Sequence, residues 1–338
     1  MVHTWKQSNQ GSLLPFEKRF IQAKILVKEK GTTNPKYGKN PENNTMQELL
    51  QRGIVVINKP PGPTSHQVAD YAKKVLKISK AGHSGTLDPA VTGVLPIALQ
   101  KSTRITHALL SAGKEYVCLM HIHKDISDEE LDAVLKKFTG KIRQLPPKRS
   151  AVKRQIRERK IYYINLLERE ERDVLFIVGC QAGTYIRKLV HDIGERLGCG
   201  AHMTELRRTK AGPFNEDIAV TLQDLTDAFH FYKEGDESYL RRIIFPVEYG
   251  VKHLKKIWVF DEAIGSMCHG AYLKVPGISK LDSDIQKEDT VAVMSLKDEL
   301  VLVGKAMMHS REMISSKRGI AVQTEQVFMK AGVYPKDM

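Results

Sequence analysis

The sequence predicts an α+β fold, with a mostly antiparallel or mixed central sheet flanked by helices and a small C-terminal β domain. Segments with the apolar period of helices alternate irregularly with strand-like runs, and no regular strand–helix–strand repeat connects them. From about residue 254 onward the chain consists mainly of short strands, such as 290–294 and 300–304, separated by turns. A chain of 338 residues has room for one to three domains of ~100–200 residues each.

The first fifty residues differ from the rest of the chain because they are polar and rich in Lys, Asn, Gly and Pro. Residues 31–35 (GTTNP) and 40–44 (NPENN) have the composition of turns. A segment of this kind cannot bury a core of its own. We therefore expect residues 1–50 to form an extension that packs on the folded domains.

Ordered structure is predicted to begin with an apolar strand at 53–57, followed by a helix capped by Thr64 or Ser65. Ser127 and Glu130 have the spacing of a capping box, and the helix that they open stops at Gly140. The other predicted elements each present an apolar face: helices at 103–110, 185–197, 222–229 and 261–269, and strands at 94–99, 116–120, 161–166 and 174–178.

The segment 81–89 (AGHSGTLDP) holds a single carboxylate, Asp88, among glycines, small hydroxyl residues and a proline. Gly82 and Gly85 permit positive φ, and Pro89 disfavours helical backbone at Asp88. We expect a loop without helix or strand, anchored by the buried strand after it. A carboxylate on such a loop suits a nucleophile or a general base, but an Asx turn is an equally good interpretation of the loop alone.

Five ordered motifs resemble those of TruB-type pseudouridine synthases, which isomerise uridine to pseudouridine in RNA. They are 59–65 (KPPGPTS), 83–89 (HSGTLDP), 114–116 (KEY), 183–187 (GTYIR) and 206–209 (LRRT). The resemblance implies a pseudouridine synthase catalytic domain at 51–250. It also implies a PUA domain, a compact RNA-binding β-barrel, at 254–330.

The resemblance assigns the catalytic role to Asp88, with Arg187 as its partner in a two-bond fork and Tyr116 stacked on the flipped base. A tyrosine in a strand and an arginine on a helix are, taken alone, more often packing and solvated residues. The other implied pocket residues are Leu206 as apolar lining, Lys59 and Tyr185 as braces, and His83 in base extrusion. The isomerisation needs no cofactor and no metal, because no electrons or groups leave.

Positive charge favours a polyanionic partner. Lys and Arg number 53 against 39 acids, a net charge of +14. Within 148–160, seven of thirteen residues are cationic, and the segment resembles the family's mobile RNA-gripping thumb loop. The predicted RNA-binding residues are Lys148, Arg149, Lys153, Arg154, Arg157, Arg159 and Lys160.

Two subclasses share this core: stand-alone enzymes acting on the T-arm of tRNA, and dyskerin-like subunits of H/ACA ribonucleoproteins. The N-terminal extension, the double prolines at 60–61 and 146–147 and the long C-terminal segment resemble archaeal dyskerin-like proteins. That resemblance implies an H/ACA guide RNA, target rRNA or tRNA, a kink-turn-binding protein and a GAR-domain-type protein as partners. The alternative from another class is a non-catalytic RNA scaffold, which intact Asp88, Tyr116 and Arg187 disfavour.

The four cysteines are far apart and form no CxxC pair, which argues against a zinc ribbon or a disulfide framework. No apolar stretch approaches the ~18 residues of a membrane span, and the N-terminus lacks a signal-peptide core. We therefore expect a cytoplasmic protein without membrane contact.

Overall fold

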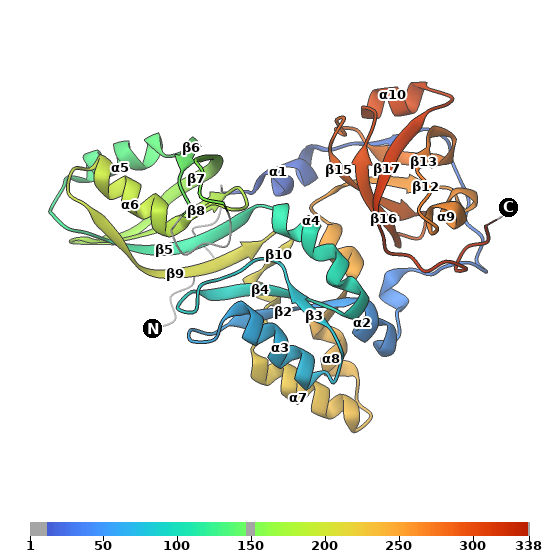
Figure 1. The fold of residues 1–338 in the computed structure, drawn as a ribbon, viewed down its shortest axis with the longest axis horizontal. Coiled ribbons are helices and arrows are strands. Elements are labelled where there is room, and N and C mark those ends of the chain that lie inside the picture. The colour runs from blue at the N-terminus through green and yellow to red at the C-terminus, as the bar shows by residue number, and fades with distance from the viewer. Residues whose placement is uncertain (1–11, 147–152, 337–338) are drawn as a thin grey trace.

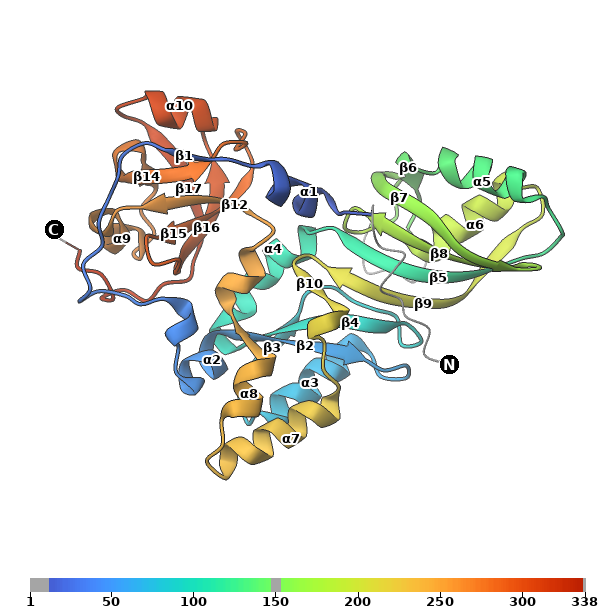
Figure 2. The same ribbon diagram turned by 180° about the vertical axis from the view of Figure 1, so that it is seen from behind.

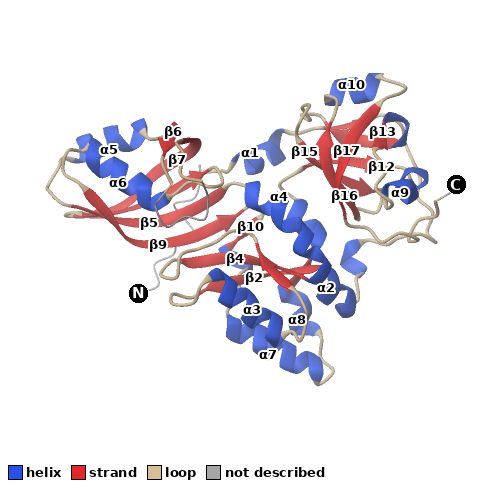
Figure 3. Ribbon diagram, in the orientation of Figure 1, coloured by secondary structure: helices blue, strands red, loops and turns tan. Residues whose placement is uncertain are grey.

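The computed structural model describes residues 12–146 and 153–336, and it contains two sheets (Figures 1 and 3). The larger, ten-stranded sheet confirms the prediction of an α+β fold with a mixed sheet. Its neighbouring strands pair antiparallel, except for the short parallel pairing of β4 with β9. In spatial order its main path is β11 (Ile244–Pro246), β2 (Gly53–Lys59), β4 (Thr92–Leu99), β9 (Ala201–Ala211), β5 (Lys114–Ile122), β8 (Asp173–Cys180), β7 (Arg157–Glu170) and β6 (Gly140–Gln144). Beside this path, β10 (Phe214–Asn215) pairs with β9, and β3 (Ala81–His83) pairs with β4.

Each half of this sheet has its own helices and its own core. On one half, α2 (Met46–Arg52), α3 (Ser65–Val75), α7 (Leu222–Lys233) and α8 (Ser238–Ile243) cover β2 and β4. On the other, α5 (Asp128–Lys137) and α6 (Ile186–Arg196) cover β5, β8 and β9. The halves meet at β4 and β9, where Thr92 pairs with Arg207 and Gly93 with Arg208. The residues of the predicted site lie around this junction.

Three local predictions need correction. Residues 81–83 form the strand β3, because their main chain pairs with the buried strand β4 despite the poor strand propensity of Gly82. The helix predicted at 103–110 begins as a 3-10 helix, η2 (Gln100–Ile105), and continues as α4 (Thr106–Ser111). Ser127 caps α5 by accepting from Glu130 N at 3.2 Å, but the reciprocal bond of a capping box is not formed.

The second sheet combines C-terminal strands with one from the N-terminus. Its order is β1 (Ile25–Val27), β14 (Ile278–Asp282), β12 (Lys255–Val259), β15 (Thr290–Ser295), β16 (Leu300–Ala306), β17 (Ile320–Val327) and β13 (Leu273–Lys274). The N-terminal segment runs along this sheet after α1 (Pro15–Gln22) (Figure 2), and Arg19 pairs with Asp282 at 2.9 Å. Residues 12–50 therefore contribute to the C-terminal sheet instead of only lying over it.

Shorter helices complete the described chain: α9 (Asp261–Met267), α10 (Ser310–Ser315), η1 (Pro41–Asn43), η3 (Glu216–Ile218), η4 (Val247–Val251) and η5 (Val275–Gly277). Among the described residues, no helix is both long enough and apolar enough to cross a membrane.

Candidate active site

The loop that carries Asp88 is held through its main chain on both sides of that residue. Ser65, the first residue of α3, accepts from Leu87 N at 2.8 Å, and its hydroxyl donates to Leu87 O at 3.2 Å. Beyond Asp88, Gly62 N donates to Pro89 O at 2.9 Å. Leu87 is buried while Asp88 is exposed, so the backbone is anchored and the carboxylate is accessible.

Lys59, the last residue of β2, is completely buried beneath this loop. Its Nζ donates to three main-chain oxygens, those of Pro60 at 2.8 Å, Pro89 at 2.9 Å and Val91 at 2.9 Å. These bonds satisfy all three donors of an ammonium group. Burial lowers the pKa of Lys59, and the negative charge of Asp88 opposes that effect. Lys59 thus contacts the loop through backbone oxygens and not through the Asp88 side chain.

Arg208 on β9 lies within the LRRT motif but was not among the predicted site residues. Its buried guanidinium donates to Val94 O at 2.7 Å and to Gly85 O at 3.3 Å, linking the loop to β4. Gly93 permits this arrangement, because a Cβ there would lie 2.2 Å from Arg208 O and its φ is +103°. Strand alternation was the available signal, since one of two adjacent arginines in a strand faces inward.

Arg187, in the first turn of α6, contacts Asp88, as its position in the motif suggested. One guanidinium nitrogen, Nη2, donates to Asp88 Oδ2. The two-bond fork expected from the sequence is wrong for this structure, because only this one nitrogen makes the contact. Both side chains are more than half exposed. The pair orients the carboxylate but leaves the second Asp88 oxygen accessible.

The two halves of the sheet bring Tyr116 and Leu206 to this junction. On adjacent strands, Tyr116 pairs with Arg208 and Leu206 with Cys118, and both side chains pack partly buried against the core beneath α6. Burial raises the pKa of Tyr116; the positive charge of Arg208 opposes this effect and the charge of Asp88 adds to it. Tyr116 is therefore a neutral phenol close to both charged groups.

Tyr185 occupies the N-cap of α6, two residues before Arg187. Its backbone N–H donates to Gln144 Oε1 at 3.0 Å, and its carbonyl accepts from Gln144 Nε2 at 3.1 Å. Gln144, which is buried at the end of β6, thereby fixes the start of the helix that carries Arg187.

His83, the last residue of β3, packs edge-on against His66 of α3, with ring centroids 4.5 Å apart. Its Nδ1 accepts from Gly85 N at 3.4 Å. Burial, together with electrostatic interactions with His66 and Arg208, lowers the pKa of His83 to about 4. The imidazole at this position is therefore neutral at physiological pH.

The basic segment is only partly a loop. Lys148 and Arg149 lie outside the described residues, while Lys153 and Arg154 are exposed and irregular. The prediction of a loop is wrong for Arg157, Arg159 and Lys160, which begin β7 and pair with Gln144, Ile142 and Lys141 of β6. Non-local pairing of main chains overrides the charged, loop-like composition here. Within the described ranges, no cluster of His, Cys, Asp and Glu could hold a metal ion.

Comparisons with known proteins identify the family to which this chain belongs. Family models match four successive parts of the chain: DKCLD over 18–69, the N-terminal domain of TruB family pseudouridylate synthases over 73–186, the tRNA pseudouridylate synthase B C-terminal domain over 187–252, and PUA over 255–328. The chain belongs to the TruB family of pseudouridine synthases and is an RNA-modifying isomerase.

Relatives match the chain over nearly its full length. The probable tRNA pseudouridine synthase B of Pyrococcus abyssi is 56% identical over 94% of this chain and 96% of its own. That of Methanopyrus kandleri is 52% identical over 96% of this chain and 95% of its own. Among solved structures, a chain of a Cbf5–Nop10–Gar1 complex is 53% identical with a TM-score of 0.92, covering 96% of this chain and 98% of that one. A chain of an H/ACA ribonucleoprotein bound to a substrate RNA containing 2'-deoxyuridine is 51% identical with a TM-score of 0.89, covering 96% of this chain and 99% of that one.

Proposed function

We propose that this protein converts specific uridines of rRNA, and of tRNA, to pseudouridine under the direction of an H/ACA guide RNA. The observation that carries the guided mode is the similarity, above 50% identity over 96% of the chain, to chains solved within H/ACA assemblies. The names of the curated relatives support tRNA as a further substrate.

Asp88 is the catalytic residue in this proposal. The reaction breaks the bond between the ribose and the uracil nitrogen, turns the base, and rejoins the ribose to carbon 5. The target uridine leaves its stack, because the bond to be broken is inaccessible within a helix. Support comes from the geometry around Asp88, whose backbone neighbours are fixed by Ser65 and Lys59 while its carboxylate stays accessible.

The remaining pocket residues position the carboxylate and the base. Arg187 orients Asp88 from α6, and Tyr116 offers a neutral ring on which the flipped base stacks. Leu206 supplies apolar lining beside it. Lys59 and Tyr185 brace the catalytic loop and the pocket, and His83 assists base extrusion.

In the proposed domain organisation, residues 1–50 are an extension, 51–250 the catalytic domain and 254–330 a PUA RNA-binding domain. Lys153, Arg154, Arg157, Arg159 and Lys160, together with Lys148 and Arg149, contact RNA phosphates. We further propose a kink-turn-binding protein and a GAR-domain-type protein as partners. Nop10 and Gar1 in the complex of the similar chain support small protein partners.

Guide exchange tests this function directly. The chain is assembled with a guide RNA whose pairing sequence matches one short target, and pseudouridine is quantified by mass spectrometry of the nucleosides. Replacing only the pairing sequence is expected to move the modification to the newly matched target. Modification of a tRNA T-arm without any guide, unchanged by guide exchange, would favour the stand-alone alternative. An inactive chain that still binds guide and target would favour a scaffold.

A further inference from the structure

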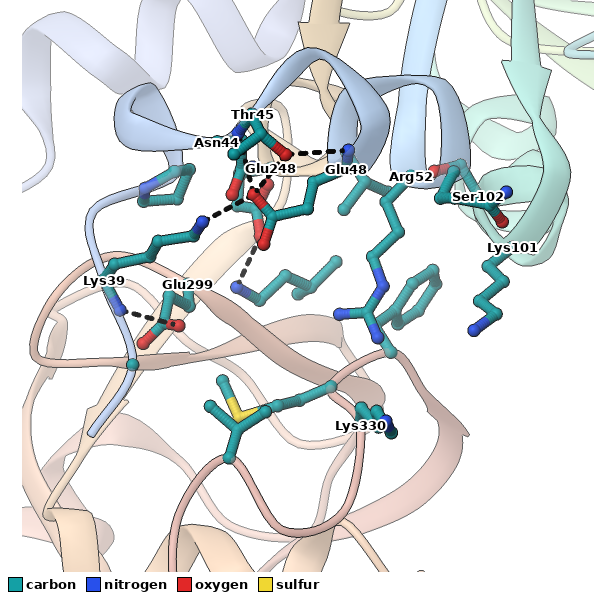
Figure 4. Close-up of a pocket in the computed structure, with 18 of the residues that line it drawn as sticks. Lys39, Asn44, Thr45, Glu48, Arg52, Lys101, Ser102, Glu248, Glu299 and Lys330 are labelled. Carbon is teal, nitrogen blue, oxygen red and sulfur yellow. Dashed lines mark hydrogen bonds and ion pairs between the residues drawn. The ribbon is translucent and has the colours of Figure 1, made fainter. Parts of the chain in front are cut away.

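A cavity separate from the Asp88 loop lies where the N-terminal segment meets the second sheet. It has a volume of about 730 Å³ and is lined by residues of the N-terminal segment, η2, η4 and the C-terminal sheet (Figure 4). This volume lies within the range of ~300–1,000 Å³ that small-molecule sites occupy.

Most acidic groups at the cavity already have partners. Glu48 of α2 pairs with Lys39 at 2.5 Å. Glu299 accepts from Lys39 N at 3.1 Å through Oε1 and from Tyr334 Oη at 2.7 Å through Oε2. These contacts join the N-terminal segment to the C-terminal sheet, so the wall is fixed and these two carboxylates are neutralised or hydrogen-bonded.

Glu248 differs from these two acids. Its Oε1 accepts from Leu300 N at 3.0 Å, but its buried Oε2 has no hydrogen-bond partner among the described residues. A buried polar atom without a partner is uncommon in folded proteins and calls for an explanation. Burial raises the pKa of Glu248, which favours its neutral form, and this oxygen is closed off from a ligand although the residue lines the cavity.

In contrast to the two paired acids, three cationic side chains at the cavity lack a protein partner in the described part of the chain. Arg52, Lys101 and Lys330 line it, and none of the three makes an ion pair or side-chain hydrogen bond with any described residue. Arg52 reaches from the end of α2 into the cavity (Figure 4). Three cations without such partners favour a phosphate, to which a guanidinium binds through two parallel bonds.

The cavity also has an apolar surface, to which Val247, Phe328 and Met329 contribute. One ligand class satisfies both features: an anionic group for the cations and a flat ring for the apolar surface. We propose that this cavity is a binding site for a nucleoside phosphate, separate from the uridine pocket. The same chemistry is offered by a free nucleotide and by one nucleotide of an RNA strand.

Calorimetric titration of the full, RNA-free chain with AMP tests this site. We expect saturable binding, weakened at least about tenfold by Arg52→Gln and by Lys330→Gln. Lys287→Gln is the matched control: it removes a charge from an exposed residue in the turn between β14 and β15, outside the cavity lining, and is expected to leave AMP affinity unchanged. Ribose 5-phosphate is expected to bind more weakly than AMP, because it lacks the base that packs on the apolar lining.

Thermal unfolding of each variant verifies that it is folded, and Lys330→Gln keeps the test open if Arg52→Gln unfolds. No saturable AMP binding, or an equal weakening in Arg52→Gln and Lys287→Gln, would overturn the proposal. A hexamer of adenylate separates the two sources. If it displaces AMP and its own affinity falls with Arg52→Gln, the ligand is a nucleotide of an RNA strand. If AMP binds here and the hexamer does not compete, the ligand is a free nucleotide.

Discussion

The loop around Asp88 and the basic start of β7 are built in opposite ways. The loop has its main chain fixed by Ser65, Lys59 and Arg208, from three different elements. The basic residues lie at the edge of the sheet, where β7 pairs with the terminal strand β6 and Arg154 is exposed. The comparison indicates that bond rearrangement requires a carboxylate held in a fixed position. Phosphate binding requires only exposed positive charges near the RNA backbone.

Asp88→Asn is expected to have the largest effect. The substitution keeps the shape and removes the ionisable group, so the rate of pseudouridine formation falls more than ~1,000-fold, about 4 kcal/mol of barrier. The measurement is the single-turnover rate on an assembled complex, with RNA affinity and thermal unfolding as controls expected to stay unchanged. A rate within about tenfold of the parent would remove Asp88 from the chemistry.

Variants of Arg187 show whether its positive charge or its two-bond guanidinium geometry supports the reaction. Because one nitrogen contacts Asp88, Arg187→Lys is expected to keep part of the rate that Arg187→Gln loses. Both side chains are more than half exposed, so stability is expected to change by no more than ~0–1 kcal/mol in either variant. If Arg187→Lys lowered the rate as much as Arg187→Gln at equal stability, the single contact would not explain the role of Arg187. The guanidinium would then have to make a second bond, to Asp88 or to the substrate.

A double variant of Arg154→Gln with Arg157→Gln is expected to weaken target binding without slowing the chemical step. The slope of log affinity against log salt is expected to fall by ~0.7–0.9 for each phosphate that the protein no longer neutralises. The matched control is Lys136→Gln with Lys137→Gln, which removes two charges from exposed residues of α5. Equal slopes for both double variants would remove the basic segment from the RNA interface.

The smallest effect expected is a pH dependence from His83. Burial lowers its pKa to about 4 from 6.5, so the folded state disfavours the protonated ring. The free energy of unfolding is therefore expected to fall as pH decreases from 6.5 toward 4, and His83→Gln to flatten that decrease. NMR of the ring is the direct measurement. Titration of His83 with a midpoint near 6.5 would contradict its burial.

The sequence was sufficient to predict the elements whose pattern is local. Thr64 caps α3 as expected, and Gly198 follows α6 with a φ of +68°. Asp88 and Arg187 were recognisable together because the motifs carry both.

What the sequence did not reveal depends on contacts between distant segments. β3 forms because its main chain hydrogen-bonds to β4. β1 pairs with β14, in a sheet formed mostly by residues beyond 254. Strand alternation indicates that one of Arg207 and Arg208 faces inward, but the burial of Arg208 depends on the pairing of β4 with β9.

The difference between the fixed Asp88 loop and the basic residues at the start of β7 is tested most directly by comparing two variants in one assay. Lys59→Met removes the three hydrogen bonds beneath the Asp88 loop, while the Arg154 and Arg157 double variant removes two positive charges near the edge of the sheet. At saturating target RNA, Lys59→Met is expected to lower the single-turnover rate by at least ~100-fold, about 2.7 kcal/mol, with the salt dependence of binding unchanged. The double variant is expected to keep the single-turnover rate and to reduce the salt dependence of binding. A normal rate in folded Lys59→Met, or a slow chemical step in the double variant, would contradict the account.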